Sequence, residues 1–241
     1  MMSVHPSKGM VCRASRHART AVVEARHART AARRAWYTRD IAGQEMPATY
    51  YDENYKKDRE DPLSESLYQA QYQKSWRKVL SLIAEDETIA DFGCGPGQFA
   101  QMAIAAKKRY VCGIDFSSEA IAWARSKNPN HSHCFYVGDL RDASVYPMVY
   151  DVAVCLETLE HIEDDLFVLS NFREGCRVVI SVPSFALSVH VRHFKTAVEV
   201  FDRYRGLLNI HEVYPVHITP YRTLWIVDGV KRRDTLKEYD Q

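Results

Sequence analysis

From about residue 88 onward, the chain alternates between short apolar runs and amphipathic stretches. The runs TIADFG (88–93), YVCGIDF (110–116) and YDVAVCLE (150–157) are apolar almost throughout, which is typical of strands covered on both faces. Between them, GQFAQMAIAAKK (97–108) and SEAIAWARSK (118–127) have the spacing of helices. This alternation predicts an α/β fold with a doubly wound, Rossmann-like and mostly parallel sheet.

The same alternation continues to the end of the chain and then changes. HCFYVGDL (133–140) and RVVISVP (177–183) are further predicted strands, and LEHIEDDLFVLSNFRE (159–174) is a predicted helix. The runs LLNIHEVYPVHI (207–218) and YRTLWIVDGVKRR (221–233) follow with no helix between them. We therefore expect them to form an antiparallel hairpin at the edge of the sheet.

The N-terminal part differs in charge from the rest. Residues 1–40 hold nine Lys or Arg and two acidic residues, a net charge of +7, so the remainder carries −6 of the overall +1. The Arg-rich near-repeat SRHARTAVVEARHARTAARRAW lacks an apolar stripe, which favours a solvated extension. A basic arm that contacts RNA or an acidic partner, and a transit peptide, are the alternatives.

We place the domain boundary after residue 47. Residues 1–47 are expected to be a basic extension, disordered or loosely helical, and residues 48–241 the folded domain. Residues 48–78 are rich in Tyr and charge and are predicted to form a lid segment before the core; the helical pattern WRKVLSLIA (76–84) begins at the end of this segment.

Composition indicates an ordinary globular protein of a reducing compartment. Apolar residues make up 46% and charged residues 26% of the chain. None of the six cysteines lies in a C-x-x-C pair, which favours free thiols over a disulfide framework. No run approaches the roughly 20 apolar residues of a membrane span, and no secretory signal is recognisable, so we expect a cytoplasmic location without membrane contact.

The turn after the first predicted strand carries the clearest chemical signal. In D-F-G-C-G-P-G (91–97), Gly93, Gly95 and Gly97 allow a tight turn and a close approach of a ligand to the backbone. The third glycine comes earlier than in the dinucleotide-binding pattern G-x-G-x-x-G, which disfavours a nicotinamide oxidoreductase. Asp91 at the strand end suits a ligand with an ammonium group better than one with phosphates.

The next two strands also end in acids. Asp115 ends the strand YVCGIDF, where a carboxylate accepts hydrogen bonds from both ribose hydroxyls of a nucleoside ligand. In VGDL, Asp139 is placed to accept an exocyclic amine and Leu140 to cover an adenine ring. These three strand ends together predict a nucleoside-binding site.

D-F-G-C-G-P-G, G-I-D and G-D-L resemble the class I S-adenosylmethionine-dependent methyltransferase family from about Val79 to the C-terminus. The resemblance implies a seven-stranded sheet whose last pair is antiparallel, with S-adenosylmethionine along the glycine turn. It implies a methyl acceptor that is a small molecule, most simply methylated on oxygen. The cofactor contacts that it implies are Asp91, Gly93, Cys94, Gly95, Gly97, Asp115, Phe116, Asp139, Leu140 and Glu157.

The segment CLETLEHI is similar to the E-x-x-E-H segment of ubiquinone-pathway O-methyltransferases and of RNA 3′-terminal 2′-O-methyltransferases. In those relatives two carboxylates and an imidazole hold a divalent ion, which assigns Glu157, Glu160 and His161 as candidate ligands. The alternative, which we favour, has no metal and uses His161 as a base for a hydroxyl proton. Glu157 then faces the cleft, and His193 is the second candidate base.

Two further segments leave alternatives open. The loop after the fifth strand offers His190 and His193, with Arg192 and Lys195, either as a basic grip on the acceptor or as a solvated loop. The tyrosines of the lid segment either contact the ligands or only pack the lid. An RNA 2′-O-methyltransferase with a metal-assisted site and a non-catalytic S-adenosylmethionine-binding protein are the competing functions. The oligomeric state does not follow from the sequence.

Deleting residues 1–40 should leave the folded domain and its binding of S-adenosylmethionine intact, because the core pattern starts later and the extension has no apolar face. Thermal unfolding and calorimetry of the truncated chain measure both. A large drop in melting temperature would show that the extension packs on the domain.

Overall fold

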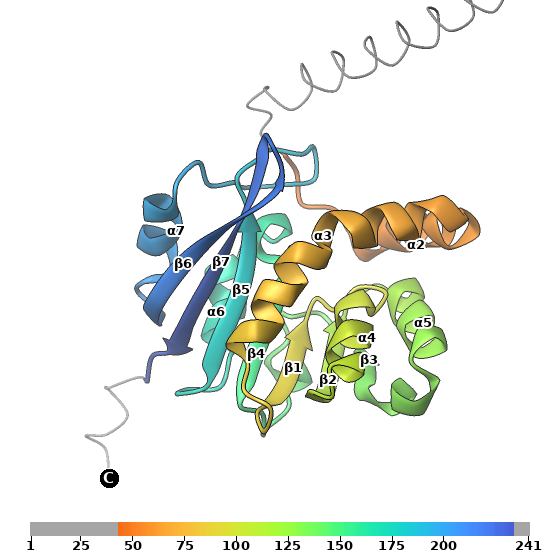
Figure 1. The fold of residues 1–241 in the computed structure, drawn as a ribbon, viewed down its shortest axis with the longest axis horizontal. Helices are drawn as coiled ribbons and strands as arrows, with labels where there is room; N and C mark the ends of the chain where they lie inside the picture. The colour runs from red at the N-terminus through yellow and green to blue at the C-terminus, as the bar shows by residue number, and fades with distance from the viewer. Residues whose placement is uncertain (1–42, 234–241) are drawn as a thin grey trace, which may run out of the picture. The chain divides into compact units, whose positions relative to one another are not determined.

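A seven-stranded sheet forms the centre of the protein in the computed structural model, which describes residues 43–233 (Figure 1). Most of the predicted basic extension, including Cys12, lies outside the described residues. The strands are β1 (Thr88–Phe92), β2 (Arg109–Asp115), β3 (Phe135–Val137), β4 (Val152–Leu156), β5 (Arg177–Pro183), β6 (Leu208–Thr219) and β7 (Arg222–Lys231).

The strand order across the sheet is β3-β2-β1-β4-β5-β7-β6. Strands β1 to β5 pair in parallel, whereas β7 is antiparallel to both β5 and β6. The predicted parallel sheet with an antiparallel C-terminal hairpin is therefore confirmed. Because β1 and β4 are neighbours, the order reverses there, and the ends of these strands mark the point where ligands bind in doubly wound folds.

The helices are α2 (Ala48–Glu60), α3 (Pro62–Leu82), α4 (Gln98–Ala105), α5 (Ser118–Lys127), α6 (Asp165–Ser170) and α7 (Ala197–Tyr204). Short 3₁₀ turns occupy Pro129–Cys134, Ala143–Val145 and Leu159–His161. The helix predicted over residues 159–174 is therefore wrong in its first part. A 3₁₀ turn and a loop replace its start, and only the short α6 is α-helical.

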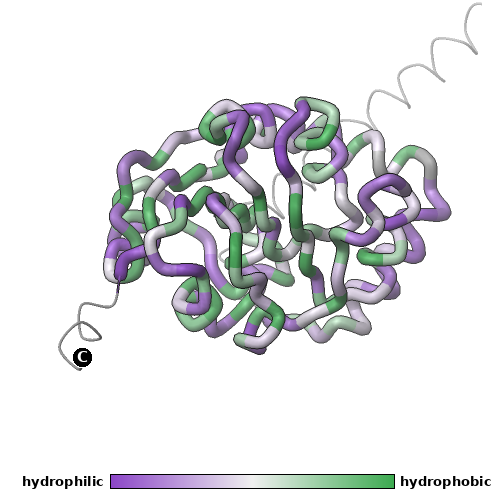
Figure 2. Tube along the Cα trace, turned by 90° about the horizontal axis from the view of Figure 1, so that it is seen from below, coloured by the Kyte–Doolittle hydropathy of each residue, from purple (hydrophilic) through white to green (hydrophobic). Residues whose placement is uncertain are grey.

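Two apolar cores cover the two faces of the sheet. In β4, Val152 and Val154 belong to one core, while the alternate positions Ala153 and Cys155 belong to the other. The first core contains side chains of α3, α4 and α5, and the second contains side chains of α6 and α7. In the trace of Figure 2, hydrophobic segments run through the interior, and hydrophilic ones are frequent along its outline. Burial on both faces explains why the parallel strands are apolar throughout.

The lid segment corresponds to α2 and most of α3. Asp52 of α2 accepts hydrogen bonds from the Ser117 hydroxyl (2.6 Å) and the Glu119 amide (3.1 Å), and so docks α2 on the start of α5. Farther along, Val79 of α3 and Ile83, just after the helix, are buried in the core on one face of the sheet. This arrangement places the tyrosines of α2 above the carboxyl ends of the strands.

The five described cysteines are buried and free, as the sequence predicted; they are Cys94, Cys112, Cys134, Cys155 and Cys176. Within residues 43–233, no helix combines the length and the apolar character that crossing a membrane requires.

Candidate functional site

The glycine turn connects β1 to α4 and requires glycine for conformational reasons. Gly93, Gly95 and Gly97 have φ angles of 79°, 52° and 75°, a region that side chains with a Cβ rarely adopt. A Cβ on Gly93 would also lie 2.2 Å from the Thr158 hydroxyl oxygen. The turn therefore brings bare backbone to the end of the sheet, as the sequence predicted.

Asp115, at the end of β2, is held against this turn. Its Oδ2 accepts the Gly95 amide and its Oδ1 accepts the Ser117 amide, both at 2.9 Å. The side chain is buried, and burial raises the pKa of Asp115 to about 6 against the opposing effect of these two hydrogen bonds. The carboxylate is thus oriented in advance for hydroxyl donors.

Asp91, at the end of β1, is more deeply buried. The Tyr110 hydroxyl donates to its Oδ2 at 3.1 Å, and burial raises the pKa of Asp91 to about 7. It lines a small cavity of about 110 Å³ together with Cys94 and Gly95 of the turn and Tyr55 of α2. A cation in this cavity would stabilise the ionised carboxylate.

A larger cavity of about 260 Å³ lies over the carboxyl ends of β1, β2, β3 and β4. It is lined by strand-end and loop residues and by the segment that precedes the core: Gly93, Asp115, Phe116, Gly138, Asp139, Leu140, Arg141, Glu157, Thr158, Glu160, His161, Ile162, Leu187, His190, Glu45, Met46, Tyr51, Tyr55, Tyr68 and Tyr72. Four of these, Tyr55, Tyr68, Gly93 and Glu157, also line the smaller cavity, so the two cavities meet at Glu157.

Glu157 occupies this junction in a strained backbone conformation, with a φ angle of 52°. The Ser181 hydroxyl donates to Glu157 Oε1 and accepts the Glu157 amide, both at 2.9 Å. Burial raises the pKa of Glu157 to about 8, and the hydrogen bond from Ser181 opposes this. Strain at a cavity-lining acid, held by one specific partner, is typical of a functional residue.

Glu160, His161 and His190 form a cluster in the larger cavity. Glu160 is fully buried, and among the described residues neither of its carboxylate oxygens has a hydrogen-bond partner. His161 Nε2 lies 3.9 Å from Glu160 Oε1. One ligand atom from each of the three residues lies within 4.8 Å of the others.

The two imidazoles of this cluster are oriented by backbone carbonyls. His161 Nδ1 lies 2.9 Å from the Val189 carbonyl, and His190 Nδ1 lies 3.1 Å from the Phe185 carbonyl. With Nδ1 as the donor in each, both Nε2 atoms are lone-pair acceptors. Burial lowers the pKa of His161, lowers that of His190 to about 3, and raises that of Glu160 well above its usual range. Both histidines are therefore neutral at pH 7.

The donor set of this cluster fits a divalent cation. A carboxylate and two imidazoles suit Zn, Mn or Mg, and the carbonyl contacts at Nδ1 are those that metal-binding histidines usually make. The unpartnered oxygens of Glu160 are an independent sign, because a buried carboxylate normally has partners. The cluster joins His190 to Glu160 and His161, whereas Glu157 of the predicted ligand set is bonded to Ser181.

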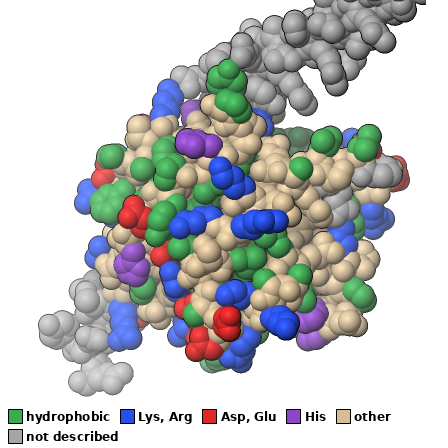
Figure 3. All heavy atoms as spheres, in the orientation of Figure 1, with side chains coloured by type: hydrophobic (Ala, Val, Ile, Leu, Met, Phe, Trp, Pro, Cys, Tyr) green, Lys and Arg blue, Asp and Glu red, His purple; other side chains and the backbone are tan. Residues whose placement is uncertain are grey.

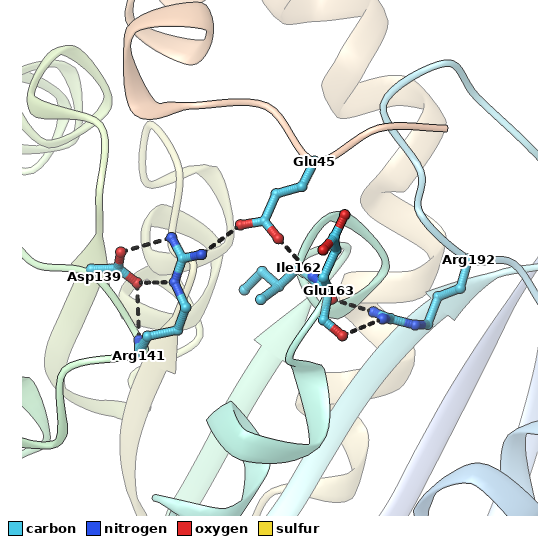
Figure 4. Close-up of polar contacts among 6 residues, drawn as sticks. All are labelled: Glu45, Asp139, Arg141, Ile162, Glu163 and Arg192. Carbon is cyan, nitrogen blue, oxygen red and sulfur yellow. Dashed lines mark hydrogen bonds and ion pairs between the residues drawn. The ribbon is translucent and has the colours of Figure 1, made fainter. Parts of the chain in front are cut away.

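A second polar cluster lies beside the strand end of β3 (Figure 4). Arg141 binds both Asp139 and Glu45, each at 2.8 Å, and the hydrogen bonds from Arg141 lower the pKa of Asp139. Glu45 also accepts the Glu163 amide at 2.7 Å. The residues before α2 therefore lie along the cavity. No motif in the sequence indicated Glu45 or Arg141, because their contacts join segments that are far apart along the chain.

The structure brings most of the sequence-predicted residues together. Gly93, Asp115, Phe116, Asp139, Leu140, Glu157, Glu160 and His161 line the larger cavity, and Asp91, Cys94 and Gly95 line the smaller one. Gly97 instead packs against α5, near Ala124 and Asn128. The histidines among the described residues that line the larger cavity are His161 and His190, and His193 is not one of them.

Comparisons with known proteins indicate a methyltransferase domain. Residues 89–178 match a family of methyltransferase domains. A ubiquinone biosynthesis O-methyltransferase of Nitrosomonas europaea is 32% identical over 95 residues, which is 36% of this chain and 37% of the relative. The corresponding protein of Aeromonas salmonicida is 34% identical over 100 residues, covering 39% and 42%. The matched region thus spans about two fifths of these relatives.

Solved structures share the fold at low identity. The magnesium protoporphyrin IX methyltransferase of Synechocystis, solved with bound S-adenosylmethionine, has a TM-score of 0.55 and 18% identity over 71% of this chain and 84% of its own. The [4+2]-cyclase SpnF has a TM-score of 0.51 and 13% identity over 70% and 82%. Because a cyclase shares it, the fold alone does not specify the reaction.

The raised pKa of Asp91 predicts a pH-dependent stability. Folding raises this pKa from its ordinary value near 3.8 to about 7, so the native state binds a proton more tightly than the unfolded state. The contribution of protonated Asp91 to the free energy of unfolding is complete below about pH 4 and is lost as the pH rises through 7. Asp91→Asn, which keeps an acceptor for Tyr110, should reduce the fall in unfolding free energy between pH 5 and 7 by about 2 kcal/mol.

Urea unfolding at several pH values measures this difference in the ligand-free protein. The matched control is Asp202→Asn, a carboxylate on the surface of α7. Identical pH profiles for Asp91→Asn and the unsubstituted protein would contradict the prediction.

Proposed function

Since the chain contains a methyltransferase domain of the class I S-adenosylmethionine-dependent family, we propose that it methylates a small molecule on a hydroxyl oxygen, with S-adenosylmethionine as the methyl donor. The observation that carries this proposal is the meeting of the two cavities at Glu157. Asp91, Cys94 and Gly95 line the smaller cavity, whereas the Glu160–His161–His190 cluster shares the larger cavity with Asp115 and Asp139.

The donor is proposed to lie along the glycine turn. Asp115 would accept the ribose hydroxyls, and Asp91 would face the ammonium group in the smaller cavity. Leu140 and Phe116 would contact the adenine ring, and Asp139 would accept its amine while remaining paired with Arg141. When bound, the donor supplies an electrophilic methyl group on a positively charged sulfur. Glu157, where the two cavities meet, would be the carboxyl group nearest to that positive charge.

His161 is proposed as the base. Its Nδ1 is engaged with the Val189 carbonyl, so the neutral imidazole presents the Nε2 lone pair to the cavity. The proton of the acceptor hydroxyl would move to Nε2, where the Glu160 carboxyl group lies 3.9 Å away. The tyrosines of α2 and α3 would align the acceptor with the methyl group, which is the main task of such an enzyme.

A divalent ion is the second possibility for this cluster, and the unpartnered oxygens of Glu160 favour it. Glu160, His161 and His190 would hold the ion, which would polarise the acceptor hydroxyl. In that case His161 is a ligand and cannot accept the proton. The two possibilities therefore make different predictions for Glu160.

A small-molecule acceptor is favoured over RNA by the cavity and by the one face that Figure 3 shows. In the face shown in Figure 3, the Lys and Arg side chains of the described residues are scattered among acidic and apolar ones and form no continuous stripe. A nucleic-acid site normally shows such a stripe. The cavity is instead covered by α2 and the residues before it, which fits a ligand that is enclosed.

The direct experiment uses donor carrying a labelled methyl group. The protein is incubated with a metabolite extract and, separately, with total RNA. The proposal expects label in a small molecule and none in RNA. Label in RNA alone would replace the small-molecule proposal with the RNA alternative, and label in neither fraction would favour the non-catalytic alternative.

Asp115→Asn should weaken binding of S-adenosylmethionine by about 2 kcal/mol, because it replaces a charge-assisted acceptor of the ribose hydroxyls. Isothermal calorimetry gives the affinity. Asp202→Asn is the control, since Asp202 is a surface carboxylate of α7 that lines neither cavity. Equal affinities for Asp115→Asn and Asp202→Asn would place the ribose elsewhere.

The role of the cluster is decided by Glu160→Gln combined with a chelator. If His161 is the base, chelator leaves turnover unchanged, and His161→Ala lowers turnover by about 10²–10⁴. Glu160→Gln then lowers turnover only slightly, because Gln resembles a protonated Glu. We expect these results. Turnover that is lost in chelator and restored by Zn or Mg, with Glu160→Gln as damaging as His161→Ala, would assign the metal instead.

A further inference from the structure

Arg192, on the loop after β5, reaches across to the turn that carries two residues of the cluster. We refer to Leu159–Glu163 as the 159–163 turn; it contains Glu160 and His161. Arg192 Nη1 donates to the carbonyls of Leu159 and Ile162, and Nη2 donates to the carbonyl of Glu163 at 2.8 Å. Figure 4 shows the guanidinium against the backbone of this turn, opposite Glu45. One side chain thus binds three carbonyls of one turn.

Asp165 of α6 forms an ion pair with this guanidinium. Asp165 is fully buried at the start of α6, and its Oδ1 lies 3.4 Å from Arg192 Nη2. The same carboxylate binds Arg203 and the Tyr204 hydroxyl of α7. Only 17% of the Arg192 side chain is exposed. Arg192 is therefore not part of a solvated basic loop, which was one reading of the sequence.

The loop that carries Arg192 also contacts the backbone of Glu160 and the side chain of His161. The Val191 amide donates to the Glu160 carbonyl at 2.8 Å, and the Val189 carbonyl meets His161 Nδ1 at 2.9 Å. A displacement of this loop would therefore move Glu160 and His161 together. The planar fork of an arginine matches several acceptors at once, whereas a lysine ammonium is a single point of donation.

We propose that Arg192 is a positioning residue for methyl transfer. Through the three carbonyls it fixes the 159–163 turn, and so aims Glu160 and His161 at the acceptor side of the cavity. This inference rests on the proposed function, but Arg192 itself lines neither cavity and does not touch the donor. Its removal should therefore affect turnover and not donor binding.

Arg203 offers a matched control. Arg192→Met and Arg203→Met each remove one of the two guanidiniums bound to the buried Asp165, but only Arg192 binds the 159–163 turn. Arg192→Met should lower kcat about 10–100-fold, the usual effect of losing a residue that orients functional side chains, with the donor Kd within twofold of the unsubstituted protein. Arg203→Met should lose stability while kcat stays within about threefold. Arg192→Lys should fall between the two in kcat.

Hydrogen exchange gives a readout that does not need turnover. Amides of residues 158–163 should exchange faster in Arg192→Met and Arg192→Lys, and at the unsubstituted rate in Arg203→Met. If the unsubstituted protein transfers no methyl group, the proposed function fails while exchange still reports on the turn. Unchanged exchange in both Arg192 variants, or equal losses of kcat in Arg192→Met and Arg203→Met, would overturn the role of Arg192.

Discussion

Burial of carboxylates at one edge of the sheet is the constraint on which the rest of the site depends. Asp91 and Asp115 end adjacent strands, and Glu157 and Glu160 follow β4, so the topology gathers four acids where the strand order reverses. Three of them are buried, and Glu157 is partly buried. An ionised carboxylate loses much of its hydration when buried and needs compensating donors or cations. Within residues 43–233, the surrounding structure supplies donors to three of the four and none to the carboxylate of Glu160.

Hydrogen bonds from neighbouring groups compensate part of the hydration that these carboxylates lose, and they fix how the carboxylates are held. The Gly95 and Ser117 amides donate to Asp115, and the Tyr110 hydroxyl donates to Asp91. Ser181 holds Glu157 in its strained conformation. Each of these acids still has a raised pKa, because the donors offset only part of the desolvation. Such a site is set up for a ligand that carries positive charge and hydroxyl donors, and S-adenosylmethionine carries both.

The sequence was sufficient to predict the sheet and the placement of the glycine turn, Asp91 and Asp115 at the strand ends. Those features follow from local patterns, since apolar strands alternate with helices and Asp91 and Asp115 stand at strand ends. The acceptor side was less predictable. His193 was the second candidate base, but His190 is the one beside His161, because the loop after β5 turns inward and its side-chain directions depend on packing. Glu45 was missed for the same reason, since its partners are far away along the chain.

The helix predicted over residues 159–174 illustrates the same limit. Its apolar spacing is helical, yet Arg192 and the Val191 amide bind the carbonyls of its first residues and hold a 3₁₀ turn there. Tertiary hydrogen bonds have overridden a local preference, and they did so at the residues on which the proposed chemistry depends.

Calorimetry of S-adenosylmethionine binding at pH 6.5, in buffers of different ionisation enthalpy, tests the central claim most directly. With pKa values of about 7 and about 6 in the free protein, Asp91 and Asp115 are partly protonated at this pH. Pairing with the donor requires their ionised forms, so binding should release protons and the measured enthalpy should depend on the buffer. Binding with proton uptake, or with no exchange of protons, would contradict the account.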